Sequence, residues 1–298
     1  MELGNELNEY KDIIESELDK TLPNEGMLQE KVFKAMRYSI FAGGKRLRPI
    51  LTLKACKLIS GDYKKALPFA LALEMIHTYS LIHDDLPAMD DDDYRRGKLT
   101  NHKVYGEDIA ILAGDALLNY AYETMIDAIK NNKNYRNEYI NAFIEIAKAA
   151  GVFGMIGGQV VDVLSEGKDI GEETLKFIHK NKTSALIEAS IVAGAIIGGA
   201  TEQEINKLRQ YGKAIGLGYQ IRDDILDEIG DINKLGKDIG SDEENNKVTY
   251  VAMYGLEKSI EETKRLSEIA KNALKLFEHK ETVDFFKRLC NYLVEREV

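Results

Sequence analysis

Two aspartate-rich stretches contain the residues best suited to chemistry. "HDDLPAMDDDDYRRG" places six aspartates within residues 84–93 and ends in an arginine pair, and "RDDILD" at 222–227 repeats the pattern on a smaller scale. Each stretch follows an apolar segment typical of a buried helix, whereas a solvated acidic run has polar neighbours on both sides. Because burying unpaired carboxylates is costly, these groups need cationic partners. Neighbouring arginines or a hard divalent ion such as Mg²⁺ can fill that role.

The spacing of the aspartates predicts which of them can meet at a metal. Asp223 and Asp227 are four residues apart, so on a helix they point from one face. Asp84 and Asp90 would diverge by about 120° on a regular helix, but Pro87 resists helical continuation and can turn Asp90 back over the helix end. Two such clusters facing each other would form a cage for Mg²⁺, which usually binds one or two carboxylates together with phosphate oxygens. The expected ligand is therefore a phosphate ester.

Basic residues close to the acidic ones fit the same ligand. "FAGGKRLRP" at 41–49 places three of them at a helix boundary, where positive charge can also serve only to complement the end of a helix. Arginine forks and lysine point charges suit diphosphates, and their number suits two diphosphates better than one. The basic residues in question are Lys45, Arg46, Arg48, Arg95, Arg96, Lys182 and Lys237.

One pair of residues allows a different function. Glu74 and His77 form Glu-x-x-His, the ligand pattern of di-iron carboxylate bundles, which would indicate an oxidoreductase or an iron store. That pattern should occur twice, and it occurs once. His77 on an apolar face could also be an ordinary core histidine. However, it precedes Asp84 by seven residues and so lies on the same helix face, which favours a place in the site.

The elements that position these residues are predicted to be helices. All four prolines fall in the first third of the chain, apolar residues recur at intervals of three and four, and no alternating strand pattern is present. We expect an all-α protein with one domain over residues 1–298. Helices are expected near 4–21, 27–41, 49–60, 64–86, 107–131, 136–165, 172–199 in two pieces, 202–229, 247–275 and 281–296.

Composition restricts the setting and the partners. Two distant cysteines indicate a reducing compartment, and the acidic start of the chain does not resemble a signal peptide, so we expect a cytoplasmic protein. The apolar stretch at 185–200 is too short to span a bilayer and is expected to be a core helix. A net charge of −10 without a basic stripe argues against nucleic acid as a partner.

The motifs taken together resemble a known family over nearly the whole chain. In order, they are "GGKRLRP", "HDDLPAMDDDDYRRG", "GGQVVD", "NKTSALI", "YQIRDDILD" and "LGKDIGSD". This set is similar to that of the trans-isoprenyl diphosphate synthases, specifically the bacterial farnesyl diphosphate synthases. The resemblance implies a bundle of ten or more helices around a deep central cavity, usually assembled as a homodimer.

The resemblance also implies a role for individual residues. The residues implied to hold three Mg²⁺ ions are Asp84, Asp90 and Asp223, supported by Asp85, Asp224 and Asp227. Those implied to contact the diphosphate of the allylic substrate are Arg95, Lys182 and Lys237. Those implied to bind isopentenyl diphosphate are Lys45, Arg48, His77 and Arg96. Those implied to lie near the reacting carbons are Thr183 and Gln220, which together with Lys182 are the implied catalytic residues.

The implied reaction is Mg²⁺-dependent condensation of isopentenyl diphosphate with dimethylallyl or geranyl diphosphate. Tyr79, five residues before Asp84, resembles the aromatic residue of farnesyl-producing relatives, so a C15 product is expected, with Tyr79 and Ser80 at the floor of the cavity. A C20 product is the alternative. A noncatalytic regulatory subunit is a further alternative, but it would be expected to lack one aspartate motif, and both are intact here.

Overall fold

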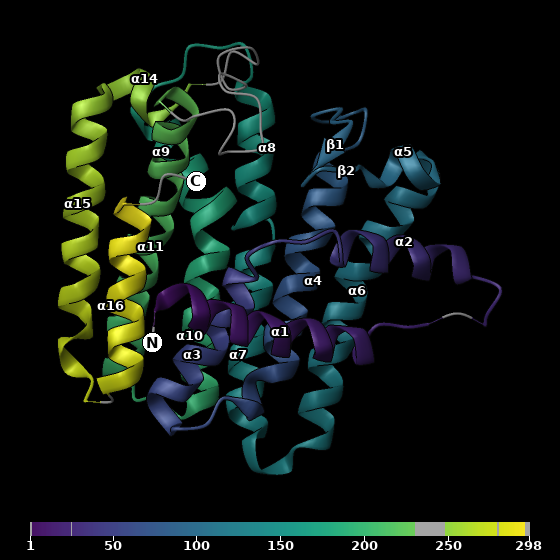
Figure 1. Ribbon diagram of the computed structural model, residues 1–298, viewed down its shortest axis with the longest axis horizontal. Helices are drawn as coiled ribbons and strands as arrows, with labels where there is room; N and C mark the ends of the chain where they lie inside the picture. Colours follow the sequence, from purple (N-terminus) through teal and green to yellow (C-terminus); the bar gives the residue numbers. More distant parts are fainter. Residues whose placement is uncertain (1, 25, 230–247, 279, 296–298) are drawn as a thin grey trace.

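The computed structural model describes residues 2–24, 26–229, 248–278 and 280–295. Within these ranges the chain is all-α apart from one short antiparallel hairpin, so the predicted fold class is confirmed. Figure 1 shows most helices running roughly along one direction, with α1 and α2 crossing them. The expected number of ten or more helices is reached within the described residues.

The helices and strands have the following bounds. The first half contains α1 (Leu3–Thr21), α2 (Glu30–Ile40), α3 (Leu47–Ser60), η1 (Lys64–Ala66), α4 (Leu67–Asp84), β1 (Tyr94–Arg95), β2 (Lys98–Leu99), α5 (Asn101–Tyr105), α6 (Glu107–Asn131), η2 (Lys133–Tyr135) and α7 (Arg136–Ala150). The second half contains α8 (Met155–Ser165), α9 (Glu172–Ile178), the π-helical turn η3 (His179–Ser184), α10 (Ala185–Gly198), α11 (Glu202–Ile229), α14 (Tyr250–Tyr254), α15 (Leu256–Ala273), η4 (Leu274–Leu276) and α16 (Lys280–Glu295).

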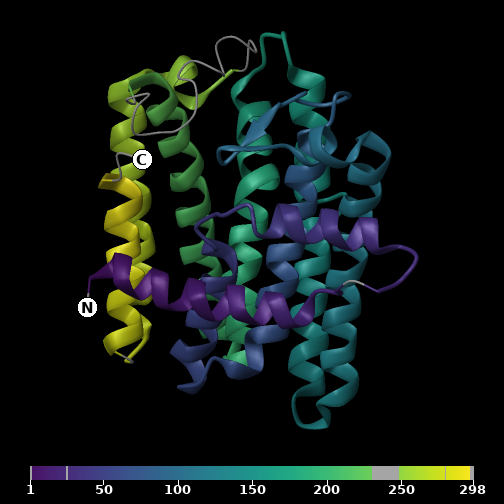
Figure 2. The same cartoon turned by 45° about the vertical axis from the view of Figure 1, so that its right-hand side comes forward.

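Helix α10 forms the centre of the bundle, as expected for the apolar stretch at 185–200. It is apolar on all sides and packs against α3, α7 and α11 (Figure 2). A side chain at Gly194 would collide with the backbone oxygen of Thr52, so glycine allows α10 and α3 to approach closely. One continuous hydrophobic core draws on buried side chains from α1 through to α16.

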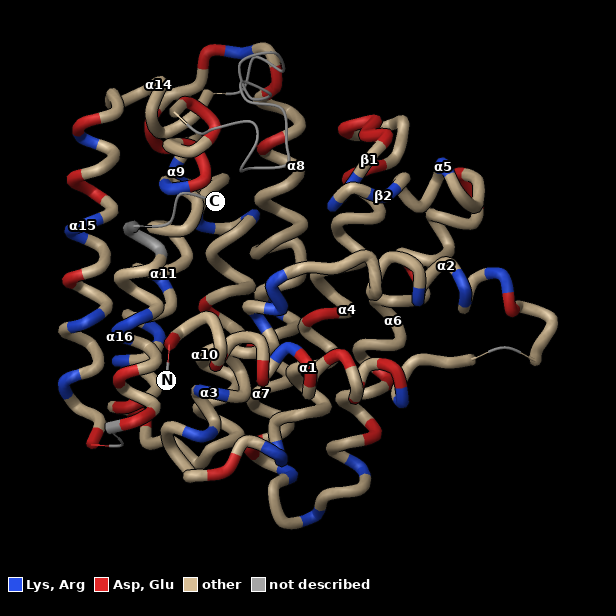
Figure 3. The backbone as a smooth tube through the Cα atoms, in the orientation of Figure 1, with Lys and Arg blue, Asp and Glu red and all other residues tan. Residues whose placement is uncertain are grey.

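The packing brings the two aspartate motifs to the same end of the bundle. The first motif follows the last turn of α4, and the second lies on the last turns of α11. Both helices end at the top of Figure 1, where acidic positions gather near the start of β1 in Figure 3. The bundle therefore presents both motifs to one region.

The structure corrects two of the expected helices. The predicted helix at 136–165 is broken at 151–154, where a side chain at Gly154 would collide with the backbone of Ala149. The predicted helix at 247–275 is interrupted at Gly255, whose φ of 85° favours glycine. The hairpin β1–β2 and the short helix α5 were not anticipated.

Residues Lys133–Ser165 are apolar and long enough, by length and composition alone, to be considered as a membrane span. The break at 151–154 divides them into α7 and α8, of 15 and 11 residues, and each is shorter than the roughly 20 residues that a bilayer requires. Much of this stretch is exposed in the single chain.

Candidate active site

The first aspartate motif closes the end of α4. After Pro87 the chain turns back, and the backbone N–H of Asp90 donates to the backbone oxygen of Asp84 over 2.9 Å. The predicted return of Asp90 over the helix end is therefore confirmed. The next residue after Asp84, Asp85, is buried, and its Oδ1 accepts a hydrogen bond of 2.5 Å from Arg95 Nε. The carboxylate of Asp85 thus has a protein partner that holds the turn together.

The electrostatic surroundings of Asp84 favour a bound cation. Burial raises the pKa of its carboxyl group to about 6, Lys182 acts in the opposite direction, and the nearby Asp90 raises it further. When a carboxyl group is desolvated and lies close to a like charge, its ionised form is stabilised strongly by a positive partner. A divalent cation placed here would therefore interact strongly with Asp84.

A cavity of about 560 Å³, here called the main cavity, opens beside Asp84. Its polar lining consists of Arg48, His77, Ser80, His83, Asp84, Gln159, Lys182 and Thr183. Its mainly apolar lining consists of Tyr79, Leu81, Met89, Met155, Ile156, Val160, Val163 and Leu164. The main cavity thus joins a charged entrance to an apolar interior, which suits a ligand with an anionic head and a hydrocarbon tail.

Arg48 and His77 form part of the charged lining. Within the described residues, Arg48 Nε is buried and has no hydrogen-bond partner, although a buried guanidinium is normally paired. Burial, together with Arg48 itself, lowers the pKa of His77 well below its ordinary value, so His77 is neutral. This wall therefore supplies one fixed positive charge and a neutral hydrogen-bonding ring, a suitable surface for an anion.

Glu74 and Arg46 have a structural role. Both side chains are buried, and Arg46 donates to Glu74 Oε1 over 2.7 Å and to the backbone oxygen of Ile40 over 2.5 Å. The Glu-x-x-His pattern therefore does not serve a di-iron site, because its carboxylate neutralises Arg46. For the same reason Arg46 has no free charge to offer a diphosphate.

The π-helical turn η3 presents Lys182 and Thr183 to the main cavity. Lys182 Nζ contacts Asp162 Oδ2 at 2.5 Å, and this ion pair holds the ammonium near the first aspartate motif. A side chain at Gly158 would collide with the backbone of Lys182, so glycine lets α8 approach the turn. This contact gives the second glycine of "GGQVVD" a structural reason, while Asp162 orients the lysine.

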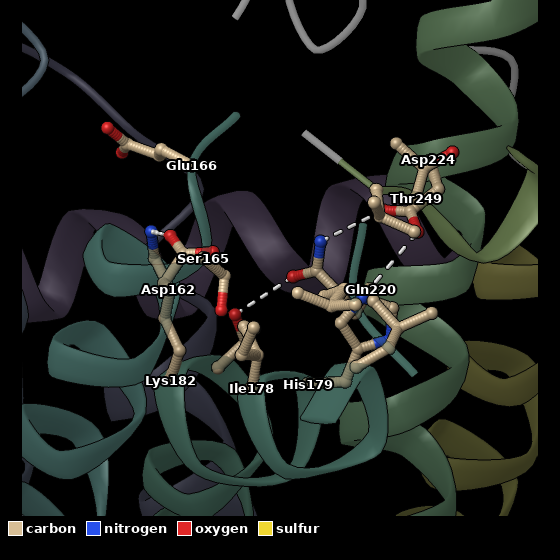
Figure 4. Close-up of a pocket in the computed structure, with 13 residues that line it drawn as sticks. Asp162, Ser165, Glu166, Ile178, His179, Lys182, Gln220, Asp224 and Thr249 are labelled. Carbon is tan, nitrogen blue, oxygen red and sulfur yellow. Dashed lines mark hydrogen bonds and ion pairs between the residues drawn. The ribbon is translucent and has the colours of Figure 1, made fainter. Parts of the chain in front are cut away.

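A second cavity of about 120 Å³ meets the main cavity at Lys182 and Thr183. Figure 4 shows its lining, with Gln220 lying between Lys182 on one side and Asp224 on the other. Thr183 Oγ1 donates to Gln220 Oε1 over 2.9 Å, and Gln220 Nε2 donates to Asp224 Oδ1 over 3.1 Å. The two polar residues predicted near the reacting carbons are thus directly hydrogen-bonded.

The second aspartate motif faces the same region from α11. Asp223 and Asp227 share a helix face as predicted, and Asp223 lies close enough to Arg48 to influence its pKa. Among the described residues, no three His, Cys, Asp or Glu side chains converge closely enough to hold a metal ion. The expected protein cage is therefore not preformed there. Since Mg²⁺ usually takes only one or two carboxylates, substrate phosphate oxygens would complete its coordination.

Three predicted substrate contacts among the described residues, Lys45, Arg95 and Arg96, do not line the main cavity, and Arg95 pairs with Asp85 instead. Lys45 lines a separate cavity of about 280 Å³ between α1 and α16, where its Nζ lies 3.5 Å from Tyr292 Oη. Arg96 hydrogen-bonds the backbone oxygen of Gly43, which ties the loop before α3 to the hairpin. Lys237 lies outside the described residues. Tyr79 and Ser80 do line the main cavity, as expected.

Sequence reasoning missed His179. This residue is buried beside the second cavity, its Nε2 lies 3.6 Å from Asp224 Oδ2, and its ring stacks on Tyr250. Burial lowers the pKa of His179 to about 4, so the ring is neutral. The only available signal was the spacing of three residues to Lys182, which is too common to indicate a site.

Comparison with known proteins gives consistent matches. A model of the polyprenyl synthetase family matches residues 29–286. The large subunit 1 of a chloroplastic heterodimeric geranylgeranyl pyrophosphate synthase from Arabidopsis thaliana is 47% identical over 289 residues, covering 96% of this chain and 77% of the relative. A geranylgeranyl diphosphate synthase from Cyanophora paradoxa is 48% identical over 275 residues, covering 92% and 90% respectively.

Solved structures agree over almost the full length of the chain. The crystal structure of an FPP/GFPP synthase from Zymomonas mobilis superimposes with a TM-score of 0.86 at 32% identity, covering 98% of each chain. Geranylgeranyl pyrophosphate synthetase from Pyrococcus horikoshii gives a TM-score of 0.89 at 31% identity, covering 99% of this chain and 98% of that chain.

Proposed function

Because the chain belongs to the polyprenyl synthetase family, we propose that it is a Mg²⁺-dependent prenyl diphosphate synthase that adds isopentenyl diphosphate to an allylic diphosphate. One observation carries the proposal: the main cavity joins Asp84, Arg48 and Lys182 to an apolar interior in a single continuous space. A prenyl diphosphate has the same division between anionic head and hydrocarbon tail. A di-iron function has no comparable support, since Glu74 is paired with Arg46.

The acidic residues fit Mg²⁺ by their chemistry and by the raised pKa of Asp84. The residues that we propose to hold the ions, three per site as the family resemblance implies, are Asp84, Asp90, Asp223 and Asp227, while Asp85 and Asp224 would support them without contacting an ion. When bound, the metal would neutralise charge that develops on the diphosphate leaving group. The two aspartates in support also have protein partners, which gives them a positioning role.

The remaining groups act on the substrates directly. Lys182, oriented by Asp162, would stabilise the diphosphate as its C–O bond breaks and leaves an allylic cation. Arg48 and His77 would hold isopentenyl diphosphate, whose double bond attacks that cation, and the departed diphosphate would accept the proton that is then lost. The oxygen of Thr183, which lines the main cavity, would face the reacting carbons, with Gln220 hydrogen-bonded behind it. The apolar lining would exclude water that could trap the cation.

Two product lengths have specific support. The names of the relatives favour geranylgeranyl diphosphate, C20, over the C15 product expected from the sequence, and we take C20 as the first candidate. The second candidate, C15, is supported by Tyr79, a ring only 6% exposed at the wall of the main cavity. Product length therefore depends on whether Tyr79 blocks the growing chain.

A homodimer is part of the proposal, and an exposed apolar face supports it. Large apolar side chains on α6, on α8 and between α7 and α8 are exposed in the single chain, among them Leu112, Val152, Phe153 and Leu164. Faces of this kind commonly mark protein interfaces. One relative is named as a subunit of a heterodimer, so a different partner chain is the alternative. A single domain over residues 1–298 and a cytoplasmic location remain predictions from the sequence.

The direct test is to incubate the purified protein with dimethylallyl diphosphate, labelled isopentenyl diphosphate and Mg²⁺, and to size the dephosphorylated products by chromatography. The proposal predicts labelled prenyl alcohols of C20 or C15, and none when Mg²⁺ is chelated. A protein that is folded and dimeric but forms no labelled prenyl product would contradict the proposal and would favour a noncatalytic subunit.

A further inference from the structure

Asp224 ends a chain of hydrogen bonds that begins at the main cavity. Thr183 Oγ1 donates to Gln220 Oε1, and Gln220 Nε2 donates to Asp224 Oδ1. The second carboxylate oxygen, Oδ2, accepts the backbone N–H of Tyr250 over 2.7 Å. Asp224 itself is 4% exposed. Both of its oxygens therefore accept hydrogen bonds from protein nitrogens.

The direction of these hydrogen bonds follows from the chemistry of Asp224, which is the last acceptor. Both oxygens of Asp224 accept hydrogen bonds from N–H donors, so Asp224 acts as an acceptor toward Gln220. Gln220 must therefore turn its amide nitrogen toward Asp224 and its carbonyl oxygen toward Thr183 (Figure 4). The single hydroxyl proton of Thr183 is then directed to Gln220, which leaves the lone pairs of Thr183 Oγ1 free for the cavity.

Building on the proposed function, we propose that Asp224 is a positioning residue. It fixes the orientation of the Thr183 hydroxyl so that the oxygen lone pairs, and not the proton, face the allylic cation. The oxygen lone pairs would face a carbon that becomes positively charged, an arrangement that stabilises the charged state without any reorganisation. With the reverse polarity, Gln220 would donate to Thr183 and the hydroxyl proton would point toward the cation. That geometry would raise the energy of the same state.

His179 and Tyr250 hold Asp224 in place. The Tyr250 backbone N–H fixes one oxygen, and the neutral ring of His179 lies beside that oxygen while it stacks on the Tyr250 ring. These contacts come from η3 and α14, so three separate segments meet at one carboxylate. These contacts hold the Asp224 carboxylate in one orientation.

The test exchanges one atom at a time. In Asp224→Asn, the amide oxygen would keep the Tyr250 N–H and the amide nitrogen would face Gln220, which would then reverse and donate to Thr183. We expect kcat to fall on the order of 10- to 100-fold, as for loss of one preorganised transition-state contact. The KM for isopentenyl diphosphate and the Mg²⁺ concentration giving half-maximal rate should stay within about 2-fold, because in this proposal Asp224 contacts neither isopentenyl diphosphate nor Mg²⁺.

A second substitution should restore the polarity. In the double variant Asp224→Asn/Gln220→Glu, the new carboxylate at position 220 accepts from both Thr183 and the new amide at position 224, so kcat should recover by about 10-fold relative to the single Asp224→Asn variant. Gln220→Glu alone places two carboxylates in contact and should be impaired. Glu202→Gln, the same type of exchange at an exposed position of α11, serves as the matched control and should leave kcat unchanged.

A third variant keeps the proposal testable if the double variant does not fold. In a Thr183→Val background the hydroxyl is absent, so adding Asp224→Asn should have no further effect on kcat.

The proposal is overturned if Asp224→Asn raises the Mg²⁺ requirement while kcat at saturating Mg²⁺ is retained, which would make Asp224 a metal ligand. It is also overturned if the double variant folds without recovery, or if the two single effects multiply in the Thr183→Val background. Lack of prenyl product from the wild-type protein would instead contradict the proposed function.

Discussion

Replacing Tyr79 with alanine should lengthen the product, because the ring forms part of the wall of the main cavity. Tyr79 lies five residues before Asp84 on α4, which corresponds to about 7.5 Å along the helix axis. Its ring is almost fully buried and meets the ring of His83 edge-on at 5.8 Å. The substitution removes a phenol, a larger group than the five-carbon unit added in each cycle. We therefore expect a product at least one isoprene unit longer than that of the wild type.

The cost in stability should be moderate. Truncating a fully buried aromatic side chain costs about 3–5 kcal/mol, but the ring of Tyr79 already borders an open cavity, so we expect about 1–3 kcal/mol. Chromatography of dephosphorylated products measures the length, and urea denaturation measures the free energy of unfolding. The variant should therefore remain folded during the assay.

Two controls isolate the effect of the ring. Tyr79→Phe keeps the ring and should keep the product length. Ile76→Ala removes a fully buried side chain from the same helix that does not line the main cavity, so it should lower stability without changing the product. If folded Tyr79→Ala makes the wild-type product, or if Ile76→Ala lengthens it equally, Tyr79 does not limit chain length.

Three further predictions concern other parts of the molecule. Arg48→Ala should raise the KM for isopentenyl diphosphate by more than Lys45→Ala does, because only Arg48 lines the main cavity; equal increases in steady-state kinetics would refute the assignment. Glu74→Gln removes the buried carboxylate partner of Arg46 and leaves the partly exposed Glu15 as its remaining ion pair, so it should lower the free energy of unfolding in urea by up to about 3–5 kcal/mol; a loss below about 1 kcal/mol would contradict a buried ion pair. Leu112→Lys should convert the proposed dimer to monomer in sedimentation experiments, and a wild-type protein that is already monomeric would refute the interface.

The local geometry of the site could largely be predicted from the sequence. Pro87 was sufficient to predict that Asp90 returns to the end of α4, because the restriction on backbone torsion is local. The shared face of Asp223 and Asp227 follows from helix periodicity alone. The lining of the cavity by Tyr79 and Ser80 followed from their position one turn before the first motif.

Contacts between distant segments could not be predicted in this way. The pairing of Arg95 with Asp85, and of Arg46 with Glu74, depends on how the hairpin and the loop before α3 fold against α4. The place of Lys45 beside α16 depends on tertiary packing too. Without coordinates, each basic residue could equally have been assigned to a substrate.

Turnover at controlled Mg²⁺ concentration tests most directly whether both aspartate motifs serve one metal-dependent reaction. Asp84→Ala and Asp223→Ala, each measured beside the exposed control Glu202→Gln, should lower kcat by on the order of 100-fold or more while helicity measured by circular dichroism is retained. The rate of the wild type should rise with Mg²⁺ and vanish when it is chelated. Near-normal turnover of either aspartate variant, or turnover that persists without divalent cations, would contradict the account.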